Sequence, residues 1–519
     1  MAQDFDIRNY GASADAGAIN TAAIQAAIDA CHAAGGGTVL CPPGVFVTGT
    51  LWLKSHVTLN LEAGCTLLGS GDRADYVEGH DFPESQAFAQ ERVSDAHLIL
   101  AYRAENVTLT GRGTIDGNSR AFLPFLDPSA GEPATARKEW KWRPGQMVFF
   151  CRCRDVSVSG LRLINSPYWT LFLHGCEQVR VHGVSIDNPR ETPCGDGLDL
   201  DCCREVTVDS CRISTGDDSI TLRANARPLG AEAFACENVA ITNCVLHTRC
   251  NAVRIGVGGG VIRNCVLSNL LIRESSIGVN VVSRYPGTAS SVEIRNIRLS
   301  NLEIDALMPI YLSTGAEGDA PVSDIALSDI GARGRTLSYI GGNAGNPIRN
   351  ITLHNVDLTM AGGKGNAPPP AGFHLKPEWE LRTMGAPYAL CVAEAGDVLL
   401  QNFRVRWGEL TGRWQHALLA MNTSGLALSH FDAASPPSDE DASSQDCGDS
   451  SAIHCVGCSG LHLRSCRAEA GTGCFLHVTA SPPDAAVRLL ANDFSLARDP
   501  LHCDARILEG GNLYLREHG

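Results

Sequence analysis

The chain repeats one short pattern along most of its length. Units begin at Cys153, Cys176, Cys203, Cys236, Ile262, Val292, Val322 and Ile348. Each unit holds two short runs of alternating apolar and polar residues, separated by a turn of Gly, Asn, Ser or Asp. Such alternation is typical of β-strands, and a spacing of about 25 to 33 residues between units is typical of solenoids. Because one coil cannot bury its apolar face alone, successive coils must stack and share a core.

These repeats predict an all-β fold, a right-handed parallel β-helix that forms a single domain over residues 1–519. No long amphipathic helix lies between the predicted strands, which disfavours an α/β fold. A helix is expected at Thr21–Ala34, where apolar residues follow helical spacing and Gly35–Gly37 end it. This helix is predicted to cap the open end of the solenoid, whose strand edges would otherwise invite aggregation. The part after about residue 391 is expected to extend the solenoid.

Composition excludes several classes of partner. The formal net charge is −15, and nucleic acids and anionic membranes bind proteins with a basic surface, so neither is expected as a partner. No apolar run reaches the roughly 20 residues of a membrane span. The first ten residues, MAQDFDIRNY, lack the layout of a secretory leader. The chain is therefore expected to be cytoplasmic or a mature secreted form.

Three further features of the sequence shape these expectations. Most of the 21 cysteines lie in strand-like runs and are expected to be reduced and buried. Long loops without strand patterns are predicted at Asn118–Gly145 and Ala361–Pro387, and such loops are often functional. The acidic, serine-rich stretch Ser435–Ser451 is expected to be mobile.

Two predicted turns concentrate acidic residues. The segments Cys194–Cys203 and Ser214–Arg223 have the sequences CGDGLDLDCC and STGDDSITLR. Because neighbouring coils lie about 5 Å apart, a separation close to one coil places Asp196 beside Asp217 and Asp218. Like charges raise one another's pKa, which keeps one carboxyl group protonated as a general acid. Cleavage of a glycosidic bond requires such a carboxylic acid and a second carboxylate. Ordinary turns or a calcium site remain alternatives.

The same residues resemble glycoside hydrolase family 28, the polygalacturonases and rhamnogalacturonases. The resemblance covers roughly Asp4–Leu312 and includes NYGASADAGAINTAAIQAAIDA, GRGTIDG and LINSPYWTLFLHGCEQVRVHGVSI. The family's Asn-Thr-Asp-Gly motif falls on Cys194–Gly197, and its Gly-Asp-Asp motif is intact at Gly216–Asp218. The resemblance implies that Asp217 is the general acid, that Asp196 and Asp218 orient and deprotonate the attacking water, and that the anomeric centre is inverted.

The sequence departs from the family where substrate is bound. The family's Gly-His-Gly and Ile-Gly residues correspond to CNAVRIG, so Asn251 occupies the histidine position. Its Arg-Ile-Lys motif corresponds to Asn280, Val281 and Val282. Arginine and lysine are the usual partners of a sugar carboxylate, so a changed sugar specificity is expected. The candidate substrate-binding residues are Asn251, Arg254, Asn280, Arg223, Arg284, Tyr285, Trp140, Trp142 and Trp379.

We expect an exo-acting, inverting hydrolase of pectin-like oligosaccharides or polysaccharides that uses neither a cofactor nor a metal. Trp169 is expected in the core, and His247, the histidine nearest to the missing family histidine, is expected to be structural. A polysaccharide lyase, a glycosyl-transferring or cyclising enzyme, and a carbohydrate-binding solenoid without activity remain alternatives. Association of identical chains is left open.

Overall fold

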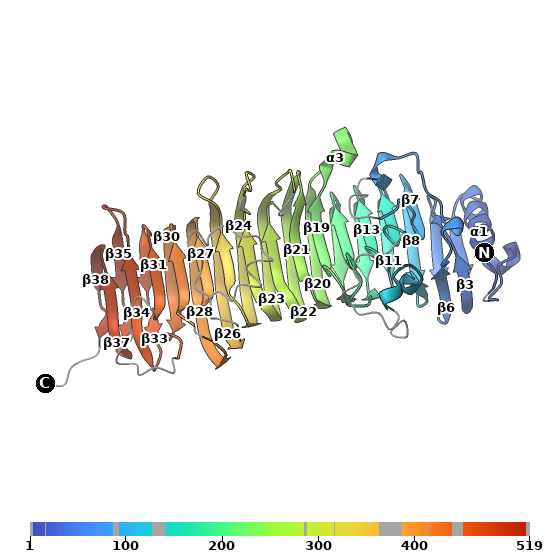
Figure 1. Cartoon of the computed structure of the whole chain (residues 1–519). Helices are drawn as coiled ribbons and strands as arrows, with labels where there is room; N and C mark the ends of the chain where they lie inside the picture. The colour runs from blue at the N-terminus through green and yellow to red at the C-terminus, as the bar shows by residue number, and fades with distance from the viewer. Residues whose placement is uncertain are drawn as a thin grey trace. The chain divides into compact units, whose positions relative to one another are not determined.

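The computed structural model describes residues 4–15, 17–86, 93–126, 142–284, 288–315, 317–362, 387–412, 414–437 and 450–514. The chain divides into two compact units. Unit 1 comprises Met1–Arg254 and Gly259–Val266, and unit 2 comprises Ile255–Gly258 and Leu267–Gly519. Each unit consists of parallel strands stacked coil upon coil, which confirms the predicted parallel β-helix (Figure 1).

Unit 1 stacks its strands in three rows. Sheet I contains β4 (Leu51–Trp52), β7 (Ile99–Tyr102), β10 (Val148–Cys151), β13 (Leu171–His174), β16 (Leu198–Asp201) and β19 (Ile220–Ala224). Sheet II contains β1 (Asp4–Asp6), β2 (Gly37–Cys41), β5 (Val57–Leu61), β8 (Glu105–Gly111), β11 (Arg154–Ser159), β14 (Glu177–His182), β17 (Arg204–Asp209) and the first half of β20 (Cys236–Thr248). Sheet III contains β3 (Gly44–Thr48), β6 (Cys65–Gly69), β9 (Thr114–Asp116), β12 (Arg162–Ile164), β15 (Ser185–Asp187), β18 (Arg212–Thr215) and the end of β20.

Sheet I is buried on both of its faces, whereas sheet II has one exposed face. In β14 buried residues alternate with more exposed ones, as expected for strands with one face in the core. In β13, β16 and β19 every residue is buried. The outward-pointing residues of sheet I therefore lie beneath other parts of the chain, and polar groups among them need partners inside the protein.

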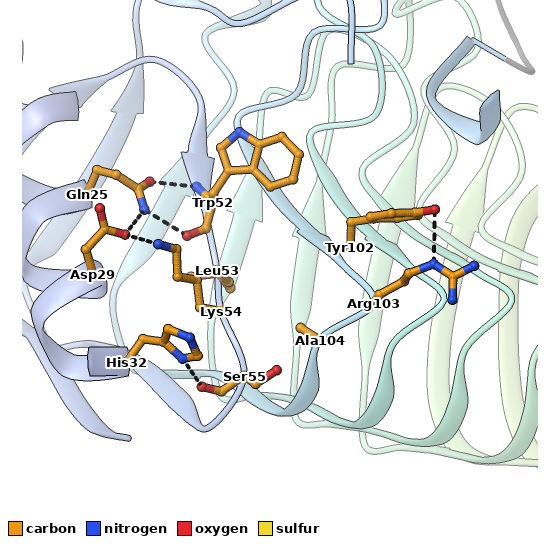
Figure 2. A pocket seen from close by; sticks show the side chains of 10 residues that line it. All are labelled: Gln25, Asp29, His32, Trp52, Leu53, Lys54, Ser55, Tyr102, Arg103 and Ala104. Atoms are coloured by element: carbon orange, nitrogen blue, oxygen red, sulfur yellow. Dashed lines mark hydrogen bonds and ion pairs between the residues drawn. The ribbon is translucent and has the colours of Figure 1, made fainter. Parts of the chain in front are cut away.

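The helix α1 (Thr21–Ala33) packs against the first strands of unit 1, as predicted for a capping helix. Its buried residues are Ile24, Ala27, Ile28 and Cys31. The Gln25 side chain completes the edge of β4, because its Oε1 accepts from the Trp52 amide at 2.8 Å and its Nε2 donates to the Trp52 carbonyl at 3.1 Å (Figure 2). Asp29 forms an ion pair with Lys54 at 2.6 Å on the same side. These contacts supply the edge strand with hydrogen-bond partners.

The other helical segments of unit 1 are short. They are α2 (Ser119–Phe122), α3 (Ala226–Leu229) and the 3-10 turns η1 (Ile7–Tyr10), η2 (Arg73–Asp75), η3 (Pro83–Gln86), η5 (Pro124–Leu126) and η7 (Gly230–Glu232). The segment around η3 covers sheet I. Phe82 stacks on Tyr102 with ring centroids 4.2 Å apart, and it shares a buried cluster with Leu100 and Phe149.

Some strands of unit 2, such as β23 (Glu293–Ser313) and β28 (Ala395–Leu410), are longer than those of unit 1 because adjacent rows join into one strand. The strands of unit 2 are β23 (Glu293–Ser313), β24 (Val322–Gly334), β25 (Ser338–Gly341), β26 (Ile348–Gly362), β27 (Tyr388–Ala393), β28 (Ala395–Leu410), β29 (His416–Met421), β30 (Ser424–Ala433), β31 (Ser451–Val456), β32 (Leu461–Arg464), β33 (Arg467–Ala468), β34 (Thr472–Thr479), β35 (Ala486–Leu490), β36 (Asp493–Phe494), β37 (Ala497–Cys503), β38 (Arg506–Gly510) and β39 (Leu513–Tyr514). Two strands, β21 (Asn251–Gly258) and β22 (Val261–Val282), contribute residues to both units. Strands therefore continue beyond residue 391, as expected.

Other sequence-based predictions have mixed outcomes. The 20 cysteines among the described residues are all free and mostly buried, as expected. Residues 127–141 and 363–386 of the two predicted loops, and residues 438–449 of the acidic stretch, lie outside the described residues. The single-domain organisation stays a prediction. Among the described residues, no helix is long and apolar enough to cross a membrane.

Candidate active site

The three candidate catalytic aspartates lie on stacked turns of unit 1. Asp196 lies two residues before β16, and Asp217 and Asp218 lie between β18 and β19. The two turns are hydrogen-bonded, because the Gly197 amide donates to the Asp218 carbonyl at 2.8 Å. The predicted clustering of Asp196 with the Asp217–Asp218 pair is thus observed. Asp196 and Asp218 are buried, and Asp217 is the least buried of the three.

Two glycines permit this close stacking. A Cβ atom at Gly197 would lie 2.5 Å from the Ser219 carbonyl oxygen, and one at Gly216 would lie 2.6 Å from the Thr192 carbonyl oxygen. Both positions therefore exclude any side chain, since backbone atoms cannot yield as a flexible side chain can. Packing therefore explains the glycines of the two acidic motifs.

Arg223 joins two of the carboxylates in the buried site. Its Nη2 donates to Asp196 Oδ2 at 2.7 Å, and its Nε donates to Asp199 Oδ1 at 2.7 Å. The guanidinium carbon lies 4.2 Å from the centre of the Trp169 ring. Trp169 is itself buried, as predicted, and stacks on Tyr168. Arg223 thus compensates the charge of both aspartates, and its predicted contact with substrate stays a prediction.

Protons bind tightly to the carboxylates around Arg223. Burial, together with the neighbouring carboxylates of Asp199 and Asp217, raises the pKa of Asp196 well above its ordinary value, and Arg223 opposes this shift. Burial also raises the pKa of Asp199 to about 6. Burial by itself lowers the pKa of Arg223, but Asp199 and Asp196 raise it well above its ordinary value. The site therefore combines an arginine that is always charged with carboxyl groups that can exchange a proton.

Asn251 and Arg254 hold Asp218 in place. The Asn251 side-chain amide donates to Asp218 Oδ1 at 2.5 Å, and its backbone amide donates to the same oxygen at 3.2 Å. Arg254 Nε lies 3.8 Å from Asp218 Oδ2. Both residues were predicted to bind substrate, and both lie beside the aspartates. An asparagine can orient a carboxylate but cannot exchange a proton near neutral pH, as histidine can.

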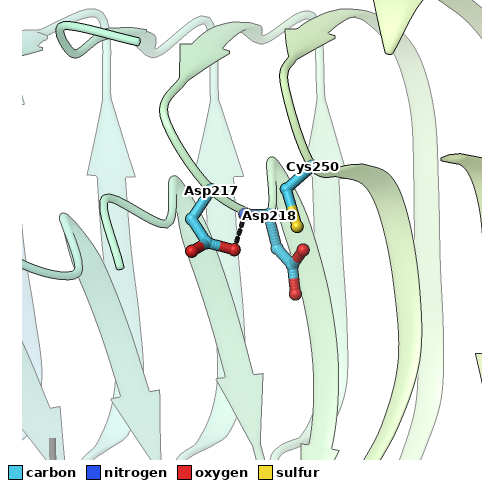
Figure 3. Close-up of side chains that lie close together, drawn as sticks. All are labelled: Asp217, Asp218 and Cys250. Atoms are coloured by element: carbon cyan, nitrogen blue, oxygen red, sulfur yellow. Dashed lines mark hydrogen bonds between the residues drawn. The ribbon is translucent and has the colours of Figure 1, made fainter. Parts of the chain in front are cut away.

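Asp217, Asp218 and Cys250 form a compact group (Figure 3). Their potential ligand atoms lie within 4.8 Å of one another, and the Asp218 amide donates to Asp217 Oδ1 at 3.0 Å. Calcium prefers six to eight oxygen ligands. This group offers two carboxylates and a thiol, and the Arg254 cation lies next to Asp218. These residues therefore fit the calcium alternative poorly.

The remaining described candidate residues belong partly to unit 1 and partly to unit 2. Asn280 is buried in the part of β22 that belongs to unit 2. Arg284, also in unit 2, forms an ion pair with Glu317 at 3.0 Å. In unit 1 the Trp142 ring packs edge-on against Phe122, with ring centroids 5.4 Å apart. Their substrate contacts stay predictions. Three further candidates, Trp140, Tyr285 and Trp379, lie outside the described residues.

Sequence reasoning missed two members of the site. Asp199 and Cys250 were not singled out, although Asp199 stands only three residues after Asp196 in an alternating LDLD run. An acidic residue in a strand of otherwise apolar character was the available signal. His247 Nε2 lies 2.9 Å from Nη1 of Arg190, and the expected structural or surface role of His247 stays a prediction.

A cavity of about 530 Å³ lies between α1 and sheet I, apart from the aspartates (Figure 2). Trp52, Lys54 and Arg103 are among its lining residues. Several of its polar groups already bind the helix to the strands, including the Asp29–Lys54 ion pair. The carboxylate cluster of unit 1 therefore remains the candidate active site.

The chain is similar in sequence and in fold to known proteins. An exo-poly-alpha-D-galacturonosidase from Dickeya chrysanthemi is 27% identical over 345 residues, which cover 58% of this chain and 56% of the relative. The match therefore spans little more than half of that relative's length. A family 28 exopolygalacturonase from Yersinia enterocolitica is 19% identical with a TM-score of 0.59, covering 83% of this chain and 78% of the solved chain.

A second solved structure supports the fold. The polygalacturonase from Erwinia carotovora ssp. carotovora is 19% identical with a TM-score of 0.55, and the alignment covers 69% of this chain and 93% of that one. The fold is a right-handed parallel β-helix, as predicted. The model of the family described as "Glycosyl hydrolases family 28" matches residues 47–368, a span that includes all three aspartates. With its stacked acidic turns and this match over more than half of its length, the chain belongs to glycosyl hydrolases family 28.

Proposed function

We propose that this protein is an inverting, exo-acting glycoside hydrolase that cleaves pectin-like or related oligosaccharides. The observation that carries this proposal is the cluster of Asp196, Asp217 and Asp218 on two hydrogen-bonded turns. Hydrolysis of a glycosidic bond requires one carboxylic acid and one carboxylate on opposite sides of the bond. Membership of the glycosyl hydrolase family supports the same chemistry.

Asp217 is proposed as the general acid. It is the least buried of the three aspartates, so it can reach the leaving oxygen of a bound sugar. Its backbone carbonyl accepts hydrogen bonds from the Thr215 hydroxyl at 2.7 Å and from the Thr248 hydroxyl, which fix the turn. Fixed geometry favours proton transfer, because the acid must lie within hydrogen-bonding reach of the oxygen that it protonates.

Asp196 and Asp218 are proposed to activate the attacking water. Both are buried and held by donors, Asp196 by Arg223 and Asp218 by Asn251. The water oxygen bonds to the anomeric carbon as the bond to the leaving sugar breaks. Its proton passes to one of these carboxylates while Asp217 protonates the leaving oxygen, so the charges balance. Attack from the face opposite the leaving group inverts the anomeric centre.

Exo-action is supported by the covering of sheet I in unit 1. Phe149 in β10 and Leu100 in β7 are in register with Phe172 and Asp199 of the following coils. Both residues are almost completely buried, and Phe82 belongs to the cluster that covers them. A long polysaccharide could not continue over these coils past the aspartates. A substrate that enters with one chain end avoids this obstruction.

Sugar specificity is proposed to differ from that of galacturonan hydrolases. The name of the Dickeya chrysanthemi relative describes action on a galacturonide, whose carboxylates need cationic partners. The family's Arg-Ile-Lys residues are replaced by Asn280, Val281 and Val282, and Arg223 is already bound to Asp196 and Asp199. A neutral or rhamnose-containing oligosaccharide requires no such cation at this position.

The test is a screen of the native protein against neutral, rhamnose-containing and galacturonide oligosaccharides. Released reducing ends and product lengths would be measured. We expect release of short products from a neutral or rhamnose-containing substrate. Exclusive release from galacturonides would contradict the proposed specificity, and long internal fragments would contradict exo-action. A new ultraviolet-absorbing double bond would indicate a lyase instead.

A further inference from the structure

The Arg223 side chain is fixed in the site by hydrogen bonds, by burial and by an aromatic ring. It comes from β19, one coil beyond the strand that carries Asp199. Its two hydrogen bonds, both 2.7 Å long, reach Asp196 and Asp199, and about nine-tenths of its side chain is buried. Trp169 supports the flat face of the guanidinium at 4.2 Å. Arginine is suited to this arrangement because its planar fork offers several donors in fixed directions.

This arrangement prevents Arg223 from turning toward a substrate. Such a movement would leave Asp196 and Asp199 buried without their shared cation, which is strongly unfavourable. It would also remove the cation from the Trp169 ring. Arg223 therefore compensates the charges of Asp196 and Asp199 within the protein.

We propose that Arg223 is a positioning residue that acts through Asp196, opposing protonation of this carboxylate and aiming it to take a proton from the attacking water. The inference rests on the hydrolytic function proposed above. In the reaction the water oxygen bonds to the anomeric carbon, its proton moves to Asp196, and the leaving oxygen receives a proton from Asp217. Only a deprotonated Asp196 can accept that proton.

The surroundings of Asp196 explain why a cation is needed. Asp199 on β16 and the turn residues Asp217 and Asp218 contribute negative charge, and Arg223 on β19 contributes the opposing positive charge. Burial and the carboxylates favour the protonated form of Asp196. Removing the arginine would therefore favour the protonated form of Asp196 still further and weaken Asp196 as a base. Removing the Asp199 charge would have the opposite effect, because Arg223 would no longer be shared.

The experiment compares Arg223→Gln, Arg223→Lys and Asp199→Asn with the native protein. The pH dependence of kcat/KM would be measured on the best substrate from the screen. For Arg223→Gln we expect at least a tenfold loss near neutral pH and a shift of the acidic limb by about one pH unit or more to higher pH. Arg223→Lys should recover part of this loss, and Asp199→Asn should move the acidic limb to lower pH.

The alternative role makes a different prediction. If Arg223 bound a substrate carboxylate, Arg223→Lys would raise KM for acidic sugars selectively and leave the acidic limb in place, which would overturn the proposal. Thermal unfolding checks that each variant folds. If Arg223→Gln does not fold, the opposite shifts expected for Arg223→Lys and Asp199→Asn still decide the question.

A second readout requires no substrate. Carbon-13 NMR of labelled aspartate carboxyl groups, with Asp196→Asn used to assign the signal, follows the protonation of Asp196 directly. The proposal predicts that Asp196 titrates at higher pH in Arg223→Lys than in the native protein, and an unchanged titration would overturn it. Absence of hydrolysis by the native protein would instead reject the proposed function and leave this measurement intact.

Discussion

Unit 1 and unit 2 both bury ionisable side chains, but they compensate the cost differently. In unit 1 burial raises the pKa of Asp196 and Asp199, and Arg223 binds both carboxylates. In unit 2 burial lowers the pKa of His416 to about 3 and that of His454 to about 4. Burial favours the neutral form in each case. In the acidic cluster the Arg223 cation opposes this effect of burial, whereas burial and the neighbouring histidines both lower the pKa of His416 and His454.

The histidines of unit 2 are satisfied by hydrogen bonds between neutral groups. The Ser451 amide lies 3.2 Å from His416 Nδ1 and can donate only, so the hydrogen of neutral His416 is on Nε2. That nitrogen lies 3.2 Å from His454 Nδ1, which accepts, and His454 Nε2 then donates to the Thr479 hydroxyl at 3.3 Å. Protonating either ring would place two donors against each other. Burial thus leaves two carboxylates beside a shared cation in unit 1, and neutral hydrogen-bonded rings in unit 2.

The largest expected effect is on catalysis. Replacing Asp217 with Asn removes the proposed acid while preserving size, and should lower kcat by about 10²- to 10⁴-fold. The matched control is Asp187→Asn on β15 of the same unit, where the side chain is exposed. Steady-state hydrolysis of both variants would be measured. Equal activities would show that the acidic cluster of unit 1 does not perform the chemistry.

A smaller effect is expected from the packing of the acidic turns. Gly197→Ala would place a methyl group 2.5 Å from the Ser219 carbonyl oxygen. We expect destabilisation of about 1–3 kcal/mol, measured by thermal or denaturant unfolding, together with reduced activity. Gly345→Ala is the control, because its nearest contact would be an ordinary 3.6 Å. If both variants unfold alike, close stacking does not explain the glycine.

The smallest effect concerns acid stability. Folding lowers the pKa values of His416 and His454 from 6.5 to about 3 and about 4. The stabilisation from these two histidines is therefore fully present above pH 6.5, the pKa in the unfolded chain, and is lost as the pH falls toward the folded pKa values. At pH 5 the loss should be on the order of 2 kcal/mol for each histidine. Hydrogen exchange should show β29 and β31 losing protection between pH 7 and pH 5. A His454→Gln variant should lose less stability over this pH range than the native protein. An identical pH dependence of stability in both proteins would contradict this account.

The fold was predictable because its signal repeats. Alternation and turn residues recur in unit after unit, so one misread strand does not alter the conclusion. The acidic turns at Asp196 and at Asp217–Asp218 were predictable for a related reason, since a separation close to one coil implies stacking. The capping helix was signalled by its apolar spacing and by the glycines after it.

The electrostatic partners were not predictable. Arg223 was expected to contact substrate. Its hydrogen bonds to Asp196 and Asp199 could not be predicted, because sequence spacing does not show which way an arginine turns or which carboxylates it meets. Asp199 was missed because an alternating strand predicts one exposed face, whereas sheet I is buried on both faces. Double burial arises from segments distant in sequence, such as the one that contains Phe82. Long-range contacts of this kind leave little trace in local patterns.

The most direct test of the central claim is the configuration of the first product. Proton NMR would be recorded during hydrolysis, before the released sugar equilibrates between anomers. If Asp217 protonates the leaving oxygen while Asp196 and Asp218 direct water to the opposite face, the first product has the anomeric configuration opposite to that of the substrate bond. A first product of unchanged configuration would require a covalent intermediate with one aspartate as the nucleophile, and would contradict the roles assigned here.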